Sequence, residues 1–535
     1  MTGAPAPYAA TFDKAWWENR WLLLAVVLAM TVPLLWPDIP PFTDLPGHMG
    51  RYRVQLEIGG PSGLDRFYEF HWALIANLGV DLLIEPLAPM IGLEPAVKLI
   101  AAAVPALTAA GALLVAREVH GRVPPTAFFA LPLAYNHAFL FGFLNFALSM
   151  ALALLALGLW LRLDRQGRHG LRALLFVPLS LILWVVHIYG WGLLGAAAFS
   201  AEVVRAWDRG ARPPWKAIWR GGLAVLPLAP PFLLILLWRG QGSTGGTGAW
   251  FDLDSKLLWL VTVLRDRWQW WDMAGVGVVV VVLLAGTFNR QLQFSRNLLA
   301  SALFLALLFA LLPRILFGSN FADMRLAPYL FLIAVLAIRL SPAATARTAS
   351  ALAAAGLLFV GARLAGNTLS ALEYDRLFDR ELAALPHVPF GARLVSLVGR
   401  GCTEEWAKPR VEHLPGIALV RRRAFSNDQW VMAGAQLLRV DYPRGEPFTA
   451  DPSQIVTPRG CRAEQWMTVD EALASLPRGA FDYLWLIGPP PYDAGLVSGF
   501  TPVWRSGSSM LFRLPPSLSS ATSDTPRGSD TRPTR

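Results

Sequence analysis

Residues 96–116, AVKLIAAAVPALTAAGALLVA, form an apolar stretch long enough to cross the roughly 30 Å hydrocarbon core of a membrane as one helix. Further apolar stretches follow the same pattern between residues 21 and 366, although some of them are short. They cover residues 21–36, 124–140, 143–161, 173–189, 190–206, 218–238, 273–288, 297–313, 326–340 and 348–366. No soluble fold needs such a set. The sequence therefore predicts an all-α polytopic membrane protein with about eleven transmembrane helices.

The composition supports this prediction. Of the 535 residues, 54% are hydrophobic and 16% are charged, whereas an ordinary soluble domain has about 25% charged residues. These values exclude a disordered chain and weigh against a purely soluble enzyme. The net charge of +10 is compatible either with nucleic-acid binding or with the cytoplasmic loops of a membrane protein. We expect no cleavable signal peptide, because residues 21–36 lack a clear small-residue cleavage site and follow acidic and aromatic residues.

The basic residues predict the orientation of the spans. Lysines and arginines of short loops lie preferentially in the cytoplasm, and with eleven spans all the basic groups fall on one side. The N-terminus is then cytoplasmic, everything after residue 366 is outside, and the basic surplus gives no reason to expect nucleic acid. The six groups are Lys14 and Arg20; Arg117 and Arg122; Arg162, Arg165, Arg168 and Arg172; Arg205, Arg209, Arg212, Lys216 and Arg220; Arg290 and Arg296; Arg339 and Arg347.

Whether residues 72–92 cross the membrane decides on which side the later loops lie. They are apolar enough to span, yet they contain Asp81, Glu85 and two prolines. If they crossed the membrane, the basic groups before and after them would lie on opposite sides. We therefore predict an interfacial or re-entrant helix within one long outer loop, residues 37–95. An ordinary span with functional carboxylates is the alternative.

The composition changes after residue 366, so residues 1–366 are predicted to be the transmembrane domain. Residues 367–513 are predicted to form a small α/β periplasmic domain, with buried strands at 393–398 and 483–487 and a hairpin over 501–514 that turns at 506–508. Cys402 and Cys461 both lie in it. An oxidising compartment allows such a pair to form a disulfide, and two unpaired thiols are the alternative. The tail, residues 514–535, is predicted to be disordered.

Candidate chemistry begins directly after the first span, in the segment PPFTDLPGH at residues 40–48. Asp44 and His48 are followed by Arg51 and Arg53, a combination that suits a site that binds an anion and moves a proton. A carboxylate near lipid tends to have a raised pKa, which makes it a better base. The alternative is that Asp44 caps a helix while the arginines contact lipid headgroups.

Other polar residues are predicted at the same outer level, at the ends of spans. Polar groups in lipid are costly and usually face a cavity or one another, so their gathering predicts a polar cavity open to the outer side. For each residue alone, a hydrogen bond between helices is the alternative. These residues are Asn136, His137, Asn145, His187, Tyr189, Arg314, Asp323 and Arg325.

The outer loop 239–272 combines a glycine-rich segment, residues 240–248, with a tryptophan-rich one. The second segment is typical of an amphipathic helix in the membrane interface, and we expect an anchor more than a gate. It contains Trp259, Trp268, Trp270 and Trp271 together with Arg265 and Arg267.

The order of a first span, a long outer loop with an early aspartate, many spans and a terminal outer domain resembles the GT-C glycosyltransferases. This family includes protein O-mannosyltransferases and lipid A aminoarabinose transferases. More narrowly, TDLPGH at residues 43–48 together with FGFLNF at residues 141–146 resembles bacterial GT-C-like membrane proteins. No HExxH, GxSxG, Walker A or CxxC pattern occurs in the chain.

The resemblance implies an inverting transfer of a sugar from a polyprenyl-phosphate carrier to an acceptor glycan, lipid or protein. The reaction would take place at the outer face of a bacterial inner membrane, within the lipid bilayer. Asp44, aided by His48, would be the base, and Arg325 or Arg51 would bind the phosphate. A second carboxylate is not adjacent to Asp44; Asp81, Glu85 and Asp323 are the alternatives, which leaves a divalent metal open. The other expected substrate-binding residues are Arg53, Asp81, Glu85, His137, Asn145 and His187.

Two other functions remain open at this point. A transporter or flippase of a lipid-linked saccharide would need alternating access and inverted repeats of spans, and no such symmetry is evident in the sequence. A non-enzymatic scaffold whose outer domain binds a partner is the third hypothesis.

Overall fold

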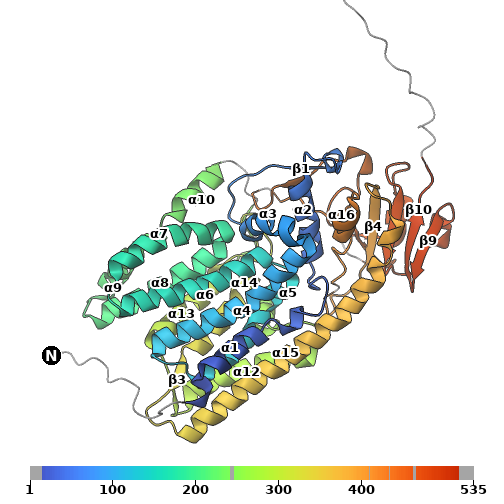
Figure 1. Cartoon of the computed structure of the whole chain (residues 1–535). Helices are drawn as coiled ribbons and strands as arrows, with labels where there is room; N and C mark the ends of the chain where they lie inside the picture. Colours follow the sequence, from blue (N-terminus) through green and yellow to red (C-terminus); the bar gives the residue numbers. More distant parts are fainter. Residues whose placement is uncertain (1–14, 241–245, 409, 433, 462–465, 517–535) are drawn as a thin grey trace, which may run out of the picture.

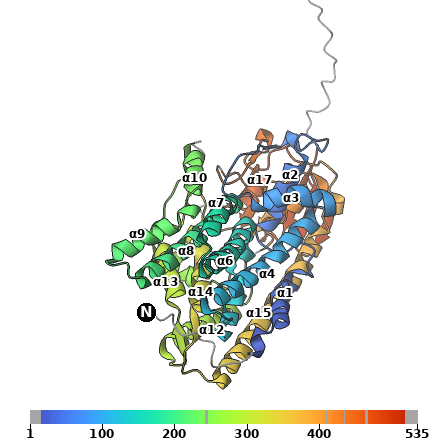
Figure 2. The same ribbon diagram turned by 60° about the vertical axis from the view of Figure 1, so that its left-hand side comes forward.

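The computed structural model describes residues 15–516 apart from 241–245, 409, 433 and 462–465. Its helices run side by side, and a β-sheet formed by the C-terminal part lies at one end of them (Figures 1 and 2). Predictions for Lys14, for the cytoplasmic N-terminus and for the tail beyond residue 516 fall outside the described residues.

Apolar helices dominate the first two thirds of the chain, as predicted for a helical membrane protein. Within the described residues, five helices are long and apolar enough to cross a membrane, or six if a pair bent by 52° is one span. The predicted count of about eleven therefore stays a prediction. The five are α4 (Leu93–His120), α6 (Leu144–Arg165), α7 (His169–Val186), α12 (Gln269–Phe288) and α15 (Ala346–Leu382), and the bent pair joins α9 (Pro214–Ala224) to α10 (Pro231–Gly240).

Most of the other predicted spans are helices of different lengths. Residues 124–140 do not form one continuous α-helix: they contain a 3-10 helix, Pro125–Tyr135, followed by the short helix α5, His137–Phe141. Prolines remove backbone donors from this segment, and every residue of the 3-10 helix is buried inside the protein. The remaining helices are α1 (Arg20–Ala29) with a 3-10 turn at Val32–Leu34, α8 (Ile188–Asp208), α13 (Arg296–Leu311) and α14 (Ala322–Leu336).

The long outer loop contains two helices and a strand. Helix α2 covers Leu45–Glu57 and α3 covers Gly79–Ile91. The thirteen residues of α3 extend over only about 20 Å, which is too short for a transmembrane crossing. This length agrees with the predicted interfacial or re-entrant helix. Strand β1 (Tyr68–Phe70) pairs antiparallel with β5 (Leu438–Val440), so the outer loop is joined to the C-terminal part.

The loops that carry the basic groups lie together at the opposite end of the helices. Ion pairs connect the loops of the first five groups in turn, and strand β2 (Leu292–Phe294), between Arg290 and Arg296, pairs with β3 (Ile338–Leu340), which contains Arg339 of the sixth group. If all six groups are cytoplasmic, as predicted, their loops must lie at the same end of the helices. The connecting pairs are Arg122–Glu18, Arg162–Glu118, Arg165–Glu118, Arg172–Asp164, Arg205–Asp164 and Arg296–Asp208.

The C-terminal part contains a six-stranded sheet in the order β7-β6-β4-β8-β10-β9. The central strands are parallel and apolar because the sheet is covered on both faces; every residue of β8 is buried. The predicted hairpin is present, with β9 and β10 antiparallel around residues 506–509. The strands are β4 (Leu394–Gly399), β6 (Ile455–Thr457), β7 (Met467–Thr468), β8 (Tyr483–Ile487), β9 (Thr501–Ser506) and β10 (Ser509–Arg513), with helices α16 (Gly416–Arg422) and α17 (Val469–Ala474).

Helix α15 continues without a break past the division predicted at residue 366 and ends at Leu382. Its second half is polar, so hydropathy alone ends the helix too early. Tyr374 and Phe378 are nevertheless buried there and pack in the same register as the apolar first half. Helix α15 thus links the helical part rigidly to the C-terminal sheet (Figure 1).

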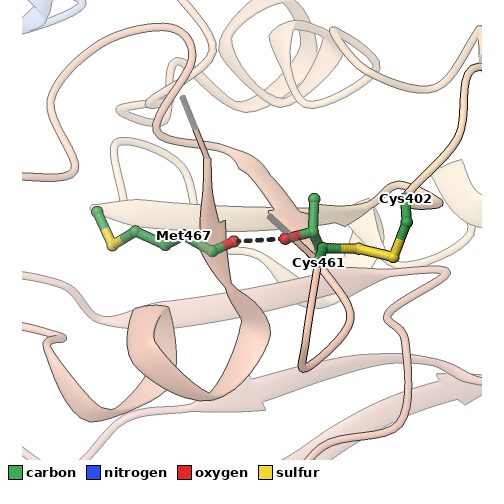
Figure 3. Close-up of a disulfide and its surroundings, with 4 residues drawn as sticks. Cys402, Cys461 and Met467 are labelled. Carbon is green, nitrogen blue, oxygen red and sulfur yellow. Dashed lines mark hydrogen bonds between the residues drawn. A yellow bond between two sulfur atoms is a disulfide. The ribbon is translucent and has the colours of Figure 1, made fainter. Parts of the chain in front are cut away.

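Cys402 and Cys461 are joined in a disulfide, with their Cα atoms 5.3 Å apart. Cys402 follows β4 and Cys461 follows β6, and Figure 3 shows the bond beside Met467 at the start of β7. The disulfide therefore ties together the segments that leave two neighbouring parallel strands.

The tryptophan-rich outer loop contains helix α11 (Leu253–Val261). Trp270 is 80% exposed, as expected for an interfacial anchor, but Trp259 is buried. Arg265 is also buried and donates to the backbone oxygen of Trp406, 2.7 Å away. Part of this loop therefore binds the C-terminal part, while residues 241–245 of the glycine-rich segment lie outside the described residues.

Candidate active site

A cavity of about 150 Å³ lies between the helical part and residues 430, 432 and 434–436 of the C-terminal part. It brings together six of the residues that the sequence singled out, from the start of α2, the start of α6, the junction of α7 and α8, and the start of α14. They are Asp44, His48, Asn145, His187, Tyr189 and Arg325.

The backbone around Asp44 is held by the second quoted motif. The Asp44 N–H donates to the backbone oxygen of Phe141 at 2.9 Å. Gly142 has φ 113°, and a Cβ there would lie 2.9 Å from the Asp44 nitrogen. Glycine at 142 therefore permits both the left-handed backbone and the close approach. The segments 43–48 and 141–146, far apart in the sequence, form one local structure.

The Asp44 side chain does not cap helix α2. Asp44 occupies the N-cap position of α2, but its carboxylate makes no capping hydrogen bond. The pKa of Asp44 is raised to about 7 as the net result of several effects: burial raises it most, His413 and Arg325 lower it, and the carboxylates of Glu412 and Asp451 raise it. A carboxylate with this pKa can take up a proton near neutral pH and still be available in its ionised form.

His48 lies one turn further along α2. Its ring makes an edge contact with Trp430, with 4.9 Å between ring centroids, and Nδ1 is buried without a hydrogen-bond partner among the described residues. Burial lowers the pKa of His48 well below its usual value, and the nearby charges of Arg51 and His413 lower it further. His48 is therefore a neutral imidazole at pH 7 that can donate or accept one hydrogen bond.

Arg325 supplies a buried positive charge to the cavity. Its guanidinium lies 4.2 Å from the centroid of the Phe143 ring and donates to the Ser319 hydroxyl at 3.0 Å. Its Nε is buried and has no hydrogen-bond partner among the described residues. A desolvated guanidinium with a free donor suits an anionic ligand such as a phosphate.

Asn145 and His187 complete the predicted part of the lining. Asn145 Nδ2 donates to Asn77 O at 2.9 Å and to Asp81 Oδ2 at 3.0 Å. His187 Nδ1 accepts from the Tyr189 N–H at 3.2 Å at the start of α8, which leaves Nε2 as the protonated nitrogen of a neutral ring.

The other predicted residues lie outside the cavity lining. Each is engaged within the helical part or the outer loop, so each fixes the surroundings of the cavity and does not face a substrate there. Arg51 forms a buried ion pair with Asp81, Arg53 pairs with Glu57, Glu85 accepts from Gln55, His137 packs between Phe141 and Trp259, and Asp323 pairs with Lys256.

Sequence reasoning missed every residue that the C-terminal part contributes. Trp430 and Gln436 line the cavity, and His413 lies behind Asp44. No motif marks these positions. The tight contact at Gly47, where a Cβ would lie 2.6 Å from Trp430 Cζ3, becomes visible only in the folded chain.

His413 stands among three carboxylates. Its Nε2 lies 3.9 Å from Asp44 Oδ1 and 3.8 Å from Asp451 Oδ1, and its Nδ1 lies 3.9 Å from Asp428 Oδ2. Burial lowers the pKa of His413, but Asp451, Asp44 and Asp428 together outweigh it, so the net shift is upward. The three carboxylates therefore favour a proton on the His413 ring.

Among the residues that the structure describes, no group of three or more His, Cys, Asp or Glu side chains is arranged to hold a metal ion. The use of a divalent metal stays an open expectation. No protein-family model matches the chain, and no curated protein matches its sequence significantly. Function is therefore inferred from the cavity.

Proposed function

We propose that this protein is an inverting membrane glycosyltransferase that moves a sugar from a polyprenyl-phosphate donor to an acceptor hydroxyl, with Asp44 as the base. The observation that carries the proposal is the pair Asp44 and Arg325 on one cavity: a carboxyl with a pKa of about 7 and a buried guanidinium with a free donor. Transfer from a phosphate needs a base for the attacking hydroxyl and a cation for the departing anion.

In the proposed reaction, the acceptor oxygen attacks the anomeric carbon and its proton passes to the Asp44 carboxylate. The bond from the anomeric carbon to the phosphate oxygen breaks, and the phosphate leaves with the electron pair. Arg325 binds that anion through its N–H groups. Neutral His48 and His187 offer hydrogen bonds to sugar hydroxyls from the same cavity.

The proposal includes a location. Helices α6, α8 and α14 each begin at the cavity and end near the basic loops. We place the basic loops in the cytoplasm of a bacterium, and the cavity and the C-terminal sheet at the periplasmic face of its inner membrane. About eleven spans would then separate the two sides.

An apolar helix beside the cavity supports a lipid-linked donor. On α10, Trp238 is buried, lines the cavity and donates to Gly434 O at 3.1 Å. The opposite side of the same short helix is exposed and apolar, which suits contact with lipid chains. The exposed residues are Phe232, Leu233, Leu236 and Leu237.

The test is native mass spectrometry of the purified protein in mild detergent, followed by reconstitution with the lipid that co-purifies. We expect a polyprenyl-phosphate sugar, and transfer of its sugar to an acceptor with release of polyprenyl phosphate. Movement of a labelled lipid-linked saccharide across proteoliposomes without chemical change would instead show a transporter and overturn the proposal.

A further inference from the structure

His413 belongs to the C-terminal part, yet it packs against the start of α2. Gly416, three residues later, shows how close the two segments are. A Cβ at Gly416 would lie 2.5 Å from Pro46 O and 2.9 Å from Asp428 Oδ2. The segment 413–416 therefore sits directly beneath the turn that presents Asp44 to the cavity.

The hydrogen bonds of the His413 ring assign its two nitrogens. Nδ1 lies 3.1 Å from the backbone oxygen of Asp428. A carbonyl oxygen only accepts, so Nδ1 carries a hydrogen. Nε2 is then the nitrogen that faces both Asp44 and Asp451, at 3.9 and 3.8 Å. Both distances exceed a hydrogen bond by less than 1 Å, so a small movement of the ring brings Nε2 to either carboxylate.

Asp451 lies on the side of His413 that leads to solvent. Its side chain is 28% exposed, whereas that of His413 is 9% exposed. Gln454 Nε2 donates to Asp451 Oδ1 at 2.7 Å and fixes the carboxylate toward His413. Asp451 does not line the cavity. The row Asp44, His413, Asp451 therefore runs from the cavity to the surface of the C-terminal part.

We propose that His413 relays protons from Asp44 to Asp451 and so returns Asp44 to its ionised form after each turnover. The proposal rests on the proposed role of Asp44 as base. Each transfer leaves one proton on Asp44. Nε2 of His413 takes this proton from Asp44, which regains its negative charge. Nε2 then passes a proton to Asp451, which releases it to water, so both groups recover their starting states and no electron is transferred.

Other charged groups surround this row and set its electrostatics. Asp428 is held by the Ser426 hydroxyl and the Gln429 amide, and Glu412 by Arg400. Neither Asp428 nor Glu412 lies between Asp44 and Asp451, so neither takes part in the proton transfer. The titratable and charged groups that face Asp44 or His413 are His48, Arg325, Glu412, Asp428 and Asp451, with Arg51 beside His48 and with Arg400 and Lys408 beside Glu412.

The first test replaces His413 with glutamine, which can hydrogen-bond but cannot carry a proton. We expect the kcat for sugar transfer to fall by about 10²-fold while the KM for the donor stays nearly unchanged. A second variant, H413A, should recover part of its kcat when imidazole is added. H387Q, at an exposed histidine of the same part, is the control and should keep full activity. Unchanged turnover of H413Q, or no imidazole rescue of H413A, would overturn the relay.

The second test needs no transfer activity. A hydrophobic carbodiimide modifies protonated carboxyl groups, and peptide mass spectrometry measures modification of Asp44 as a function of pH. We expect the midpoint for Asp44 to move to higher pH in H413Q, because a positive neighbour is lost. An unchanged midpoint would overturn the coupling between the two side chains. If the wild-type protein transfers no sugar, the proposed function fails, and this midpoint still decides whether His413 and Asp44 are coupled.

Discussion

Two aspartates of the same outer loop have opposite environments. Asp81 is fully buried, forms an ion pair with Arg51 and accepts from Asn145 at 3.0 Å. Asp44 is 15% exposed at its side chain, and its closest positive partner is His413 at 3.9 Å. Within the described residues, the Asp44 carboxylate makes no capping hydrogen bond to the start of α2.

The difference between the two sites shows why burial of a carboxylate does not by itself indicate catalysis. A buried charge that is fully compensated stabilises one arrangement of the chain and is a weak base. Asp44 is compensated only in part and faces the cavity, and its pKa is raised to about 7. The Asp81 site therefore serves the structure, and the Asp44 site is the one suited to moving a proton.

The largest expected effect is that of Asp44→Asn on transfer. Because asparagine cannot accept the acceptor proton, we expect the rate of sugar transfer to fall by about 10²–10⁴-fold. The measurement is release of polyprenyl phosphate by purified protein, with thermal unfolding in detergent to show that the variant is folded. Asp65→Asn, at an exposed position in the same loop, is the matched control. Full activity of the Asp44 variant would reject it as the base.

The substitution Asp81→Asn should lower the stability of the folded protein. The substitution leaves Arg51 buried without its counter-charge, so we expect the free energy of unfolding to fall by about 3–5 kcal/mol. Denaturation of the purified protein in detergent measures it. The double variant Arg51→Met with Asp81→Asn should recover much of the loss, because no unpaired charge remains. Equal loss in the single and double variants would contradict an ion-pair role.

The two aspartates should also differ in their effect on the pH dependence of stability. Since burial raises the pKa of Asp44 in the folded protein from 3.8 to about 7, the folded state holds this proton more tightly than the unfolded state does. The folded protein therefore loses stability as pH rises from about 4 to 7. Asp44→Asn should be more stable than wild type at pH 8, by at most about 4 kcal/mol, and equal to it near pH 4. Parallel melting curves across this range would contradict the raised pKa.

The smallest expected effect comes from the turn that positions Asp44. In Gly142→Ala, the new Cβ meets the Asp44 nitrogen and the backbone at φ 113° is strained, so we expect a loss of about 1–2 kcal/mol or more and a lower kcat. Gly167→Ala is the control, because Gly167 also has positive φ but has open space around it. It should lose stability by strain alone and keep its kcat. If Gly142→Ala has the same kcat as Gly167→Ala, the turn at Gly142 does not position Asp44 for the reaction.

Several elements followed from local sequence. The apolar stretches predicted helices because burial of an apolar segment in a membrane depends on its own residues. Strand β8 and the β9–β10 hairpin followed from a run of apolar residues and a Ser-Gly-Ser turn. Residues 124–140 and the end of α15 did not follow, because neighbouring helices bury the 3-10 segment and the polar second half of α15.

The sequence by itself determined which residue types stand where: an aspartate and a histidine after the first span, an arginine at the start of α14, and basic loops in a pattern that one side of a membrane explains. Only the tertiary structure decided which of them act together. It paired Arg51 with Asp81, left Arg325 facing the cavity, and brought His413 to Asp44 from the far end of the chain. The physical reason is that hydropathy and charge patterns are local, whereas desolvation and charge compensation depend on neighbours that are distant in sequence.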